Sequence, residues 1–174
     1  SQGGRCLLAA DPRILESAAD SSKWSIVVLE WASGRIKRVV RSTLAAEAYV
    51  MGEGVEGIEY LRHVMGELFI PGWRPCVRDD EEFVVPAVTV TDARSLHDNL
   101  HKEGGASKDR RLRLELNLIR ETPSLGVCWV RSEMQLADHL TKEVGGEAEA
   151  YARAVRSSPR WTLGDDQRAP PSRR

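Results

Sequence analysis

The first part of the chain alternates short apolar runs with turn signals. Residues 6–10 form an apolar run that ends at Asp11-Pro12, and residues 12–23 have the composition of a connection. Residues 26–31 are rich in β-branched side chains and predict a strand that ends at Ser33-Gly34. Residues 36–40 are predicted to be the second arm of a hairpin.

A long helix is predicted next. From Ser42 the apolar residues recur at helical spacing over about seven turns, and the pattern stops at Pro71-Gly72. Ser42 or Thr43 can cap its start. Three glycines interrupt the pattern, and each weakens a helix by about 1 kcal/mol relative to alanine. We therefore expect the helix to approach a sheet or a neighbouring helix closely at Gly52, Gly54 and Gly57.

After the long helix, strand-like and helix-like segments alternate. A polar loop over residues 74–82 precedes predicted strands over 84–91 and 127–130 and predicted helices over 93–101, 108–121 and 134–144. This order predicts one α/β domain over residues 1–144. Residues 145–157 are a candidate helical extension, and residues 158–174 are predicted to be a disordered tail because they are rich in Pro, Arg and Asp.

Composition narrows the possible classes of protein. The chain has 174 residues, of which 41% are hydrophobic, enough for one domain with a core. Its net charge of −1 excludes a uniformly basic nucleic-acid binder but leaves room for local basic patches. Three scattered cysteines favour an intracellular chain. The sequence shows no signal peptide and no apolar run long enough to span a membrane, so we expect neither secretion nor a membrane partner. Because the chain opens with Ser1, we expect it to be a piece of a longer protein.

Three acidic residues are candidates for a catalytic site. Glu47 lies early in the long helix and along its apolar stripe, Asp92 ends the strand-like run over residues 87–92, and Asp138 follows the last predicted strand. Carboxylates gathered from a helix start and strand ends can hold divalent metal ions, and paired metals hydrolyse phosphodiesters.

Each acid also has a structural interpretation. Glu47 could favour the helix dipole from the first turn, Asp92 could be an N-cap, and Asp138 could be a solvated residue at the start of an amphipathic helix. These alternatives stay open on local pattern alone.

The segments around these acids, taken in order, resemble the ribonuclease H region at the end of copia-type retrotransposon polyproteins. The resembling segments are Trp31-Ala-Ser-Gly-Arg35, Ser42-Thr-Leu-Ala-Ala-Glu-Ala48, Tyr60-Leu-Arg-His-Val-Met-Gly-Glu-Leu68, Val90-Thr-Asp-Ala-Arg-Ser-Leu96, Asn117-Leu-Ile-Arg-Glu121 and Trp129-Val-Arg-Ser-Glu-Met-Gln-Leu-Ala-Asp-His-Leu-Thr-Lys142. The last segment is the most distinctive, and the match covers residues 1–143.

The resemblance implies a ribonuclease H-like mixed sheet flanked by helices. It also implies hydrolysis of the RNA strand of an RNA–DNA hybrid by two Mg²⁺ ions, with Mn²⁺ as a substitute, and a reverse-transcriptase domain of the same polyprotein as partner. Glu47, Asp92 and Asp138 would be three of four metal-binding carboxylates. One ion would activate a water and the other would stabilise the leaving oxygen.

Two departures from the family bear on activity. The first family carboxylate lies on a first, central strand upstream of the segment that residues 3–10 resemble, and that strand is missing here. The resemblance therefore implies impaired hydrolysis, or an inactive module that binds nucleic acid or the polymerase. Asp11 is an alternative ligand, although it lies in a turn before Pro12. The second departure is Lys108-Asp-Arg-Arg-Leu112, which lacks a histidine common in the family.

Basic residues form two groups that could contact phosphates. The first precedes the Glu47 helix and the second begins a later helix, and the candidates are Arg35, Lys37, Arg38, Arg41, Lys108, Arg110 and Arg111. Both groups could equally be solvated surface. Trp31 and Trp129 are predicted to be core aromatics.

Overall fold

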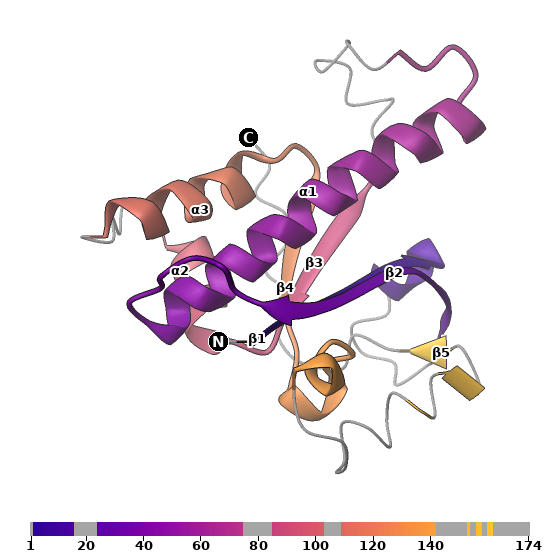
Figure 1. The fold of residues 1–174 in the computed structure, drawn as a ribbon. Helices are drawn as coiled ribbons and strands as arrows, with labels where there is room; N and C mark the ends of the chain where they lie inside the picture. The colour runs from indigo at the N-terminus through magenta and orange to yellow at the C-terminus, as the bar shows by residue number, and fades with distance from the viewer. Residues whose placement is uncertain are drawn as a thin grey trace.

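A computed structural model describes residues 2–15, 24–74, 85–102 and 109–141, together with residues 153, 156, 157, 160 and 161. These residues form a mixed α/β structure, as predicted, with three α-helices and two separate small sheets (Figure 1). None of the helices in these ranges is both long enough and apolar enough to cross a membrane.

The first sheet is antiparallel and contains β1 (Gln2–Ala10), β2 (Trp24–Arg35) and β5 (Arg160–Trp161), in that order. The hairpin partner of β2 is β1, so the prediction that residues 36–40 form the second arm is wrong. Gly3 and Gly4 pair with Gly34 and Ser33, and the ladder continues through the position where a turn was expected.

Strand β5 lies in the region predicted to be a disordered tail. Arg160 and Trp161 pair with Ser25 and Trp24 of β2. The Trp161 side chain is buried, and its indole N–H donates to the Met134 carbonyl over 3.2 Å. The prediction fails at these two residues because a buried tryptophan anchors them. The other residues of that tail, and most of the candidate extension over 145–157, lie outside the described residues.

The second sheet consists of two parallel strands, β3 (Ala87–Thr91) and β4 (Leu125–Trp129). Two helices connect them, α2 (Arg94–His101) and α3 (Arg110–Glu121). These four elements confirm the predicted alternation of strands and helices. The predicted helix over 134–144 does not form within its described residues, 134–141. Short 3₁₀ turns at Ser132–Met134 (η3) and Asp138–Leu140 (η4) occupy this region instead.

Helix α1 (Thr43–Phe69) confirms the long predicted helix, and Ser42 caps it by accepting a hydrogen bond from the Ala45 N–H. The expected close approach occurs at Gly57, where a Cβ atom would lie 2.8 Å from Leu7 Cδ1 of β1. It also occurs at Gly52, beside the Glu115 carboxylate of α3. Within the part of the chain that the structure describes, no atom lies within 4 Å of a Cβ built at Gly54, so no close approach is seen there.

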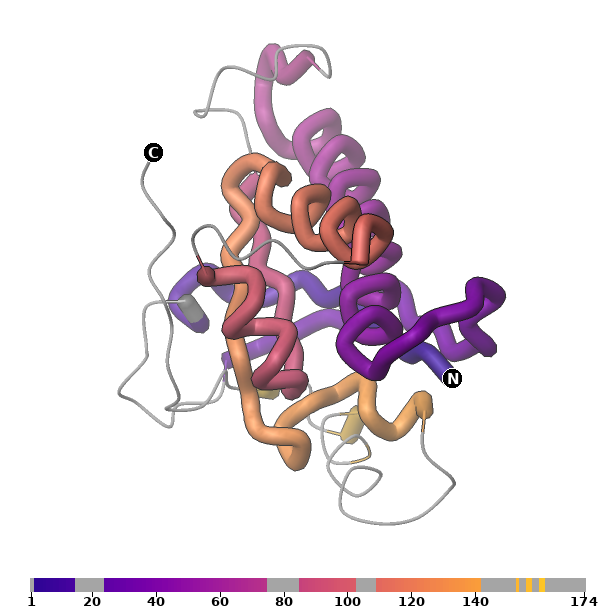
Figure 2. Tube along the Cα trace, turned by 90° about the vertical axis from the view of Figure 1, so that its left-hand side faces the viewer, coloured from indigo at the N-terminus to yellow at the C-terminus, as the bar shows by residue number. Residues whose placement is uncertain are grey.

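The core is divided into two clusters of buried residues that lie on opposite sides of the strands. One cluster joins α1, α2 and α3, which lie together in Figures 1 and 2. The other is built by Ile14, Ile26, Cys128, Val130, Leu136 and Trp161. Strand β4 contributes to both, because Val127 packs on the first cluster and Cys128 belongs to the second. Trp31 is 67% exposed, so its prediction as a core residue is wrong, whereas Trp129 is half-buried.

Arg62 ties α1 to the second sheet. Its side chain is 8% exposed and donates to the Val85 carbonyl (2.5 Å), just before β3. The same guanidinium donates to the carbonyls of Pro123 (2.7 Å) and Ser124 (3.2 Å), just before β4. Glu59 balances its charge at 2.6 Å. One side chain thus satisfies three backbone carbonyls at the start of both parallel strands.

We expect Arg62→Met to lower the free energy of unfolding by about 2–4 kcal/mol, because it leaves these carbonyls without their donor. Arg62→Lys should recover less than half of that loss, since an ammonium group cannot reach all three carbonyls in a fork. Urea denaturation followed by tryptophan fluorescence measures both values. Arg113→Met, at an exposed position on α3, is the control. A loss at Arg62 no larger than at Arg113 would contradict this role.

Candidate functional site

A cavity of about 810 Å³ separates the two sheets. Every residue of β1 and every residue of β3 lines it. Among the described residues, Leu29 is the one residue of β2 in the lining, and no residue of β4 lines the cavity. Among the described residues, β1 pairs with β2 on one edge and β3 pairs with β4 on one edge, and neither strand has a partner on its second edge. The second edges of β1 and β3 therefore face each other across this space, which we call the interstrand cavity.

The two facing strands run in opposite directions along α1. At the beginning of α1, Val50 lies against Gly3 near the start of β1. Further along α1, Gly57 lies against Leu7. Strand β3 runs the other way, because Val85 before its start contacts Arg62 while Asp92 after its end lies within electrostatic range of Glu47. The start of β1 and the end of β3 thus meet near the beginning of α1.

Glu47 lies on the face of α1 that lines the cavity. That face also presents Thr43, Val50 and Gly54, at the three- and four-residue spacing of one side of a helix. The first turn of α1 contains no acidic residue, so the helix-dipole interpretation of Glu47 is wrong. Its half-buried carboxyl lines the cavity, as its place in the apolar stripe predicted.

Asp92 directly follows β3 and also lines the cavity. It does not cap α2, because the N-cap position is Ala93 and the Ala93 N–H donates to Thr91 Oγ1. The N-cap interpretation is therefore wrong. Asp92 Oδ2 instead accepts a hydrogen bond from the Ser132 hydroxyl at 2.7 Å, and its main-chain carbonyl accepts one from the Trp129 indole at 2.9 Å. The Ser132 hydrogen bond restricts the orientation of the carboxylate, and the Trp129 hydrogen bond holds the main chain that carries it.

Asp138 is the first residue of η4 and lines the same cavity. Its main-chain carbonyl accepts hydrogen bonds from the N–H and the hydroxyl of Thr141. The turn is held against the first sheet, because the Ser33 hydroxyl donates to the Leu140 carbonyl and Gly4 packs against Thr141. Asp138 is half-buried and does not begin an α-helix within the described residues.

We call Glu47, Asp92 and Asp138 the acidic cluster, because the structure brings them to one region of the cavity. Burial raises the pKa of the Glu47 carboxyl, and the negative charges of Asp92 and Asp138 raise it further. Residues that are far apart in the sequence are therefore close enough to interact electrostatically. This electrostatic contact is independent of any resemblance.

The donor chemistry of the acidic cluster suits Mg²⁺, which prefers carboxylate oxygens. A divalent cation would also relieve the repulsion that raises the pKa of Glu47. However, within the described ranges no three His, Cys, Asp or Glu side chains are close enough to hold one metal ion. The cluster thus provides suitable ligands that do not yet converge on a single point.

Asp11, the alternative ligand, lies at the other end of β1. Asp11 lies nine residues after Gln2, so it is roughly 30 Å from the beginning of the strand at about 3.3 Å per residue. Its carboxylate instead accepts hydrogen bonds from the side chain and main chain of Arg13, and these lower its pKa to about 2. Asp11 is therefore separated from the acidic cluster, and that alternative is wrong.

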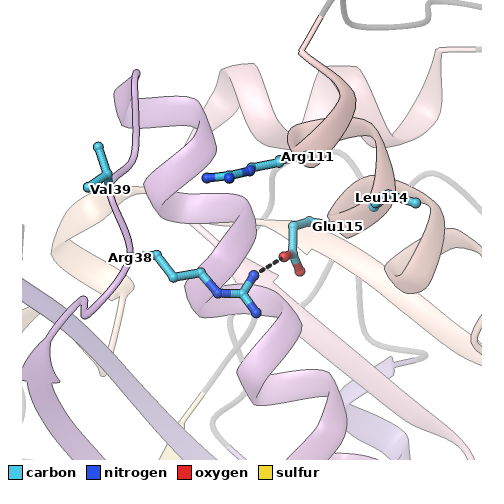
Figure 3. A pocket seen from close by; sticks show the side chains of 5 residues that line it. All are labelled: Arg38, Val39, Arg111, Leu114 and Glu115. Atoms are coloured by element: carbon cyan, nitrogen blue, oxygen red, sulfur yellow. Dashed lines mark hydrogen bonds and ion pairs between the residues drawn. The ribbon is translucent and has the colours of Figure 1, made fainter.

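The two groups of basic residues meet at one place. Arg38, in the connection before α1, and Arg111, in the first turn of α3, line a second cavity of about 430 Å³ with Val39, Leu114 and Glu115 (Figure 3). We call this region the basic surface. Arg38 forms an ion pair with Glu115 at 2.9 Å and lies over the Tyr49 ring at 4.7 Å from its centroid.

The other basic candidates are spread around this surface. Arg35 ends β2, Lys37 and Arg41 lie in the connection to α1, and Arg110 begins α3; all four are exposed. Lys108 lies outside the described residues. The basic surface and the acidic cluster lie on different sides of α1, because Tyr49 follows Glu47 by two residues, or about 200° around a helix.

Two residues that the sequence did not single out contribute to the region. Ser132 orients Asp92, and Glu115 neutralises Arg38. No local pattern marks either residue, since each acts on a side chain that is distant in the sequence.

Comparison with protein-family models, with curated proteins and with solved structures finds no match to this chain.

The raised pKa of Glu47 predicts how stability depends on pH in the metal-free protein. The folded chain binds the Glu47 proton more tightly than the unfolded chain, so this contribution to stability is fully present below about pH 4.3, the ordinary glutamate pKa. It is lost as pH rises through the raised value. Glu47→Gln should therefore unfold at a higher temperature than the unchanged protein at pH 7, with the difference shrinking toward pH 4.

Thermal unfolding in EDTA across this pH range measures the effect. Glu56→Gln, at an exposed position on the same helix, is the matched control and should show no such difference. The difference in unfolding temperature between Glu47→Gln and the unchanged protein should be larger at pH 7 than at pH 4. A smaller difference at pH 7 than at pH 4 would contradict the raised pKa.

Proposed function

We propose that this chain is a ribonuclease H-like module that hydrolyses the RNA strand of RNA–DNA hybrids with Mg²⁺. Glu47, Asp92 and Asp138 are its metal-binding carboxylates. The observation that carries the proposal is that these three residues line one cavity and interact electrostatically. They are the same three that the resemblance to copia-type ribonuclease H regions selects.

The arrangement of the elements also supports the proposal. An antiparallel pair of strands, a long helix carrying Glu47 and a parallel strand that Asp92 follows occur in the order that the resemblance implies. The resemblance further implies a central strand between the two parts of the sheet. The interstrand cavity between β1 and β3 has the position that such a strand requires.

The roles of the residues follow from their chemistry. The carboxylates would hold Mg²⁺, which when bound would supply charge stabilisation and an activated water. Ser132 keeps the Asp92 carboxylate in one orientation by donating to Oδ2. Burial and the charges of Asp92 and Asp138 raise the pKa of the half-buried Glu47 carboxyl, and a bound cation would lower that pKa again.

The substrate class follows from the resemblance and from the basic surface. Arg38 and Arg111 can contact the phosphates of a duplex. The RNA strand of that duplex would lie toward the acidic cluster in the interstrand cavity. The 2′-hydroxyl groups distinguish that strand from DNA. A reverse-transcriptase domain is the partner that the resemblance implies.

A second function is favoured by one observation. The acidic cluster lacks three ligands at a single point among the described residues. A module that binds nucleic acid through the basic surface, or binds the polymerase, without hydrolysis would have this geometry. Cleavage and binding must therefore be measured separately.

Cleavage of a labelled RNA strand in an RNA–DNA hybrid, first with Mg²⁺ and then with Mn²⁺, tests the proposal. We expect metal-dependent cleavage that Asp92→Asn lowers at least about 100-fold, since loss of a group around a metal site costs about 10–100-fold even beyond the direct ligands. Asp98→Asn on α2, whose carboxylate forms an ion pair with Arg94, is the control and should retain activity.

Binding of Mn²⁺ to the same proteins, measured by electron paramagnetic resonance, gives a second readout. Asp92→Asn should weaken it while Asp98→Asn should not. Undiminished cleavage by Asp92→Asn would overturn the site assignment. A folded chain that neither cleaves nor binds Mn²⁺ would support the second function.

Hybrid binding tests the basic surface independently of metal. Arg38→Ala/Arg111→Ala should weaken binding about 10-fold at moderate salt and reduce the slope of log K against log salt by about 2, because two phosphate contacts are lost. Glu115→Gln should strengthen binding, since it releases Arg38 from its ion pair. Fluorescence anisotropy measures both effects. Arg13→Ala/Lys102→Ala removes two exposed charges elsewhere and is the control; an equal loss there would contradict a specific surface.

A further inference from the structure

We propose that His97 and His101 of α2 form a binding site for a divalent transition-metal ion of the class that prefers imidazole ligands, namely Zn²⁺, Ni²⁺ or Cu²⁺. This site is separate from the acidic cluster, whose carboxylates suit Mg²⁺. The inference goes beyond the proposed hydrolysis and does not depend on it. It rests on the spacing of the two histidines, on the contacts of their ring nitrogens and on the burial of His97.

The first argument is the position of the two rings. His97 and His101 are four residues apart in α2, so they lie on one side of the helix and one turn apart. Their ring centroids are 4.2 Å apart, and the ring planes are tilted by 37°. Two nitrogens on one tetrahedral Zn²⁺ ion lie roughly 3.3 Å apart, because each metal–nitrogen distance is about 2.0–2.1 Å. The rings are therefore close enough to share an ion.

The second argument is the burial of His97 without a partner. The residue is 6% exposed, and within the part of the chain that the structure describes neither ring nitrogen has a hydrogen-bond partner. An unpaired buried polar group is costly, and most buried side-chain nitrogens in proteins have a partner. A metal ion bound at Nε2 would give this ring the partner that the described residues do not provide.

The third argument is the direction of the other nitrogen of each ring. His101 Nδ1 lies 2.9 Å from the His97 carbonyl, which can only accept, so this contact assigns the proton to Nδ1 and the lone pair to Nε2. His97 Nδ1 lies 3.6 Å from Asp98 Oδ1. Histidines that bind metals direct their second N–H at a carbonyl or a carboxylate in this way. Both rings thus present Nε2 as the ligand atom.

The fourth argument is charge. Burial lowers the pKa of the His97 imidazole, and the charge of His101 lowers it further. Asp98 offsets this in part, and Arg94 adds to it. Among the described residues, no charged side chain of α1, α3, β3 or β4 contributes to the balance. Because metal ions bind the neutral ring, these surroundings keep His97 in its metal-binding form at neutral pH.

The helix that carries the two rings is held by its neighbours. Leu96 and Leu100 of α2 are buried in the cluster that joins α1, α2 and α3. Arg120 of α3 donates to three main-chain carbonyls at the end of α2, those of Asn99, Leu100 and Lys102. The backbone between the two histidines is thus held before an ion binds, which lowers the entropy lost on binding.

Two imidazoles are the ligands that the described part of the chain supplies. No third His, Cys, Asp or Glu side chain joins them within the described ranges, so water would occupy the other positions around the ion. An open site of this kind follows the ordinary order of affinities, in which Cu²⁺ binds more tightly than Ni²⁺ or Zn²⁺. The exposed ring of His101 is the side from which an ion would enter.

Titration of the full chain with Ni²⁺ tests the proposal. Excess Mg²⁺ is present throughout, because it occupies carboxylate sites without competing for imidazoles. We expect saturable binding of one ion per chain by calorimetry. The unfolding temperature should rise with the Ni²⁺ concentration, since the ion binds the folded spacing of the two rings. His101→Ala, at an exposed position, should weaken binding at least about 10-fold and abolish the rise.

A matched control keeps the number of histidines and changes their spacing. His101→Ala/Lys102→His moves the second imidazole to an exposed position five residues after His97, about 140° away around the helix. This variant should bind Ni²⁺ no better than His101→Ala. His63→Ala, at an exposed position on α1, should bind Ni²⁺ as the unchanged chain does.

Electron paramagnetic resonance of bound Cu²⁺ identifies the ligands directly. The unchanged chain should show hyperfine splitting from two nitrogens, and His101→Ala from one. Circular dichroism checks that each variant is folded.

Three results would each overturn the proposal: no Ni²⁺ binding by the folded unchanged chain, undiminished binding by His101→Ala, and full binding by His101→Ala/Lys102→His. The last result would indicate scattered histidines that bind singly. Hybrid cleavage is measured with Mg²⁺ in the absence of Ni²⁺, so this proposal and the proposed hydrolysis can fail separately.

Discussion

Helix α1 is the element on which the rest of the structure depends, because no strand of one sheet pairs with a strand of the other among the described residues. The helix contacts the first sheet where Gly57 meets Leu7 and the second where Arg62 meets Val85. A helix of 27 residues is about 40 Å long and nearly rigid. It therefore fixes the separation of the two sheets, and the interstrand cavity is a consequence of that separation.

The same helix separates charges of opposite sign. Glu47 projects from α1 into the cavity with Asp92 and Asp138, while Arg38 lies over Tyr49 on a different side of the helix. The three carboxyls of the acidic cluster line the cavity, and their mutual repulsion raises the pKa of Glu47. The basic surface is partly neutralised by the ion pair between Arg38 and Glu115.

Local patterns were sufficient where a single element determines the outcome. The cap at Ser42, the helical spacing of α1 and the strand before Asp92 were all predicted because each depends on neighbouring residues. Failures occurred where a distant segment decides. Residues 36–40 do not pair with β2, because β1 is its partner. Trp161 is held in place by a hydrogen bond to the Met134 carbonyl. For Glu47 and Asp92, the sequence left two interpretations each, and the start of each helix excluded one of them: α1 begins four residues before Glu47, and the N-cap of α2 is Ala93.

The position of the acidic cluster restricts what can fill the cavity. The start of β1 and the end of β3 meet at the beginning of α1, so a central strand of the kind that the resemblance implies would end beside Glu47. An apolar strand would remove water from three carboxylates that already repel one another, and unpaired buried charge is costly. Its end must therefore bring positive charge, or a cation must bind there, or Glu47 must hold a proton. The raised pKa of Glu47 lowers the free-energy cost of the third of these. Filling the cavity and neutralising the acidic cluster are consequently one coupled event rather than two.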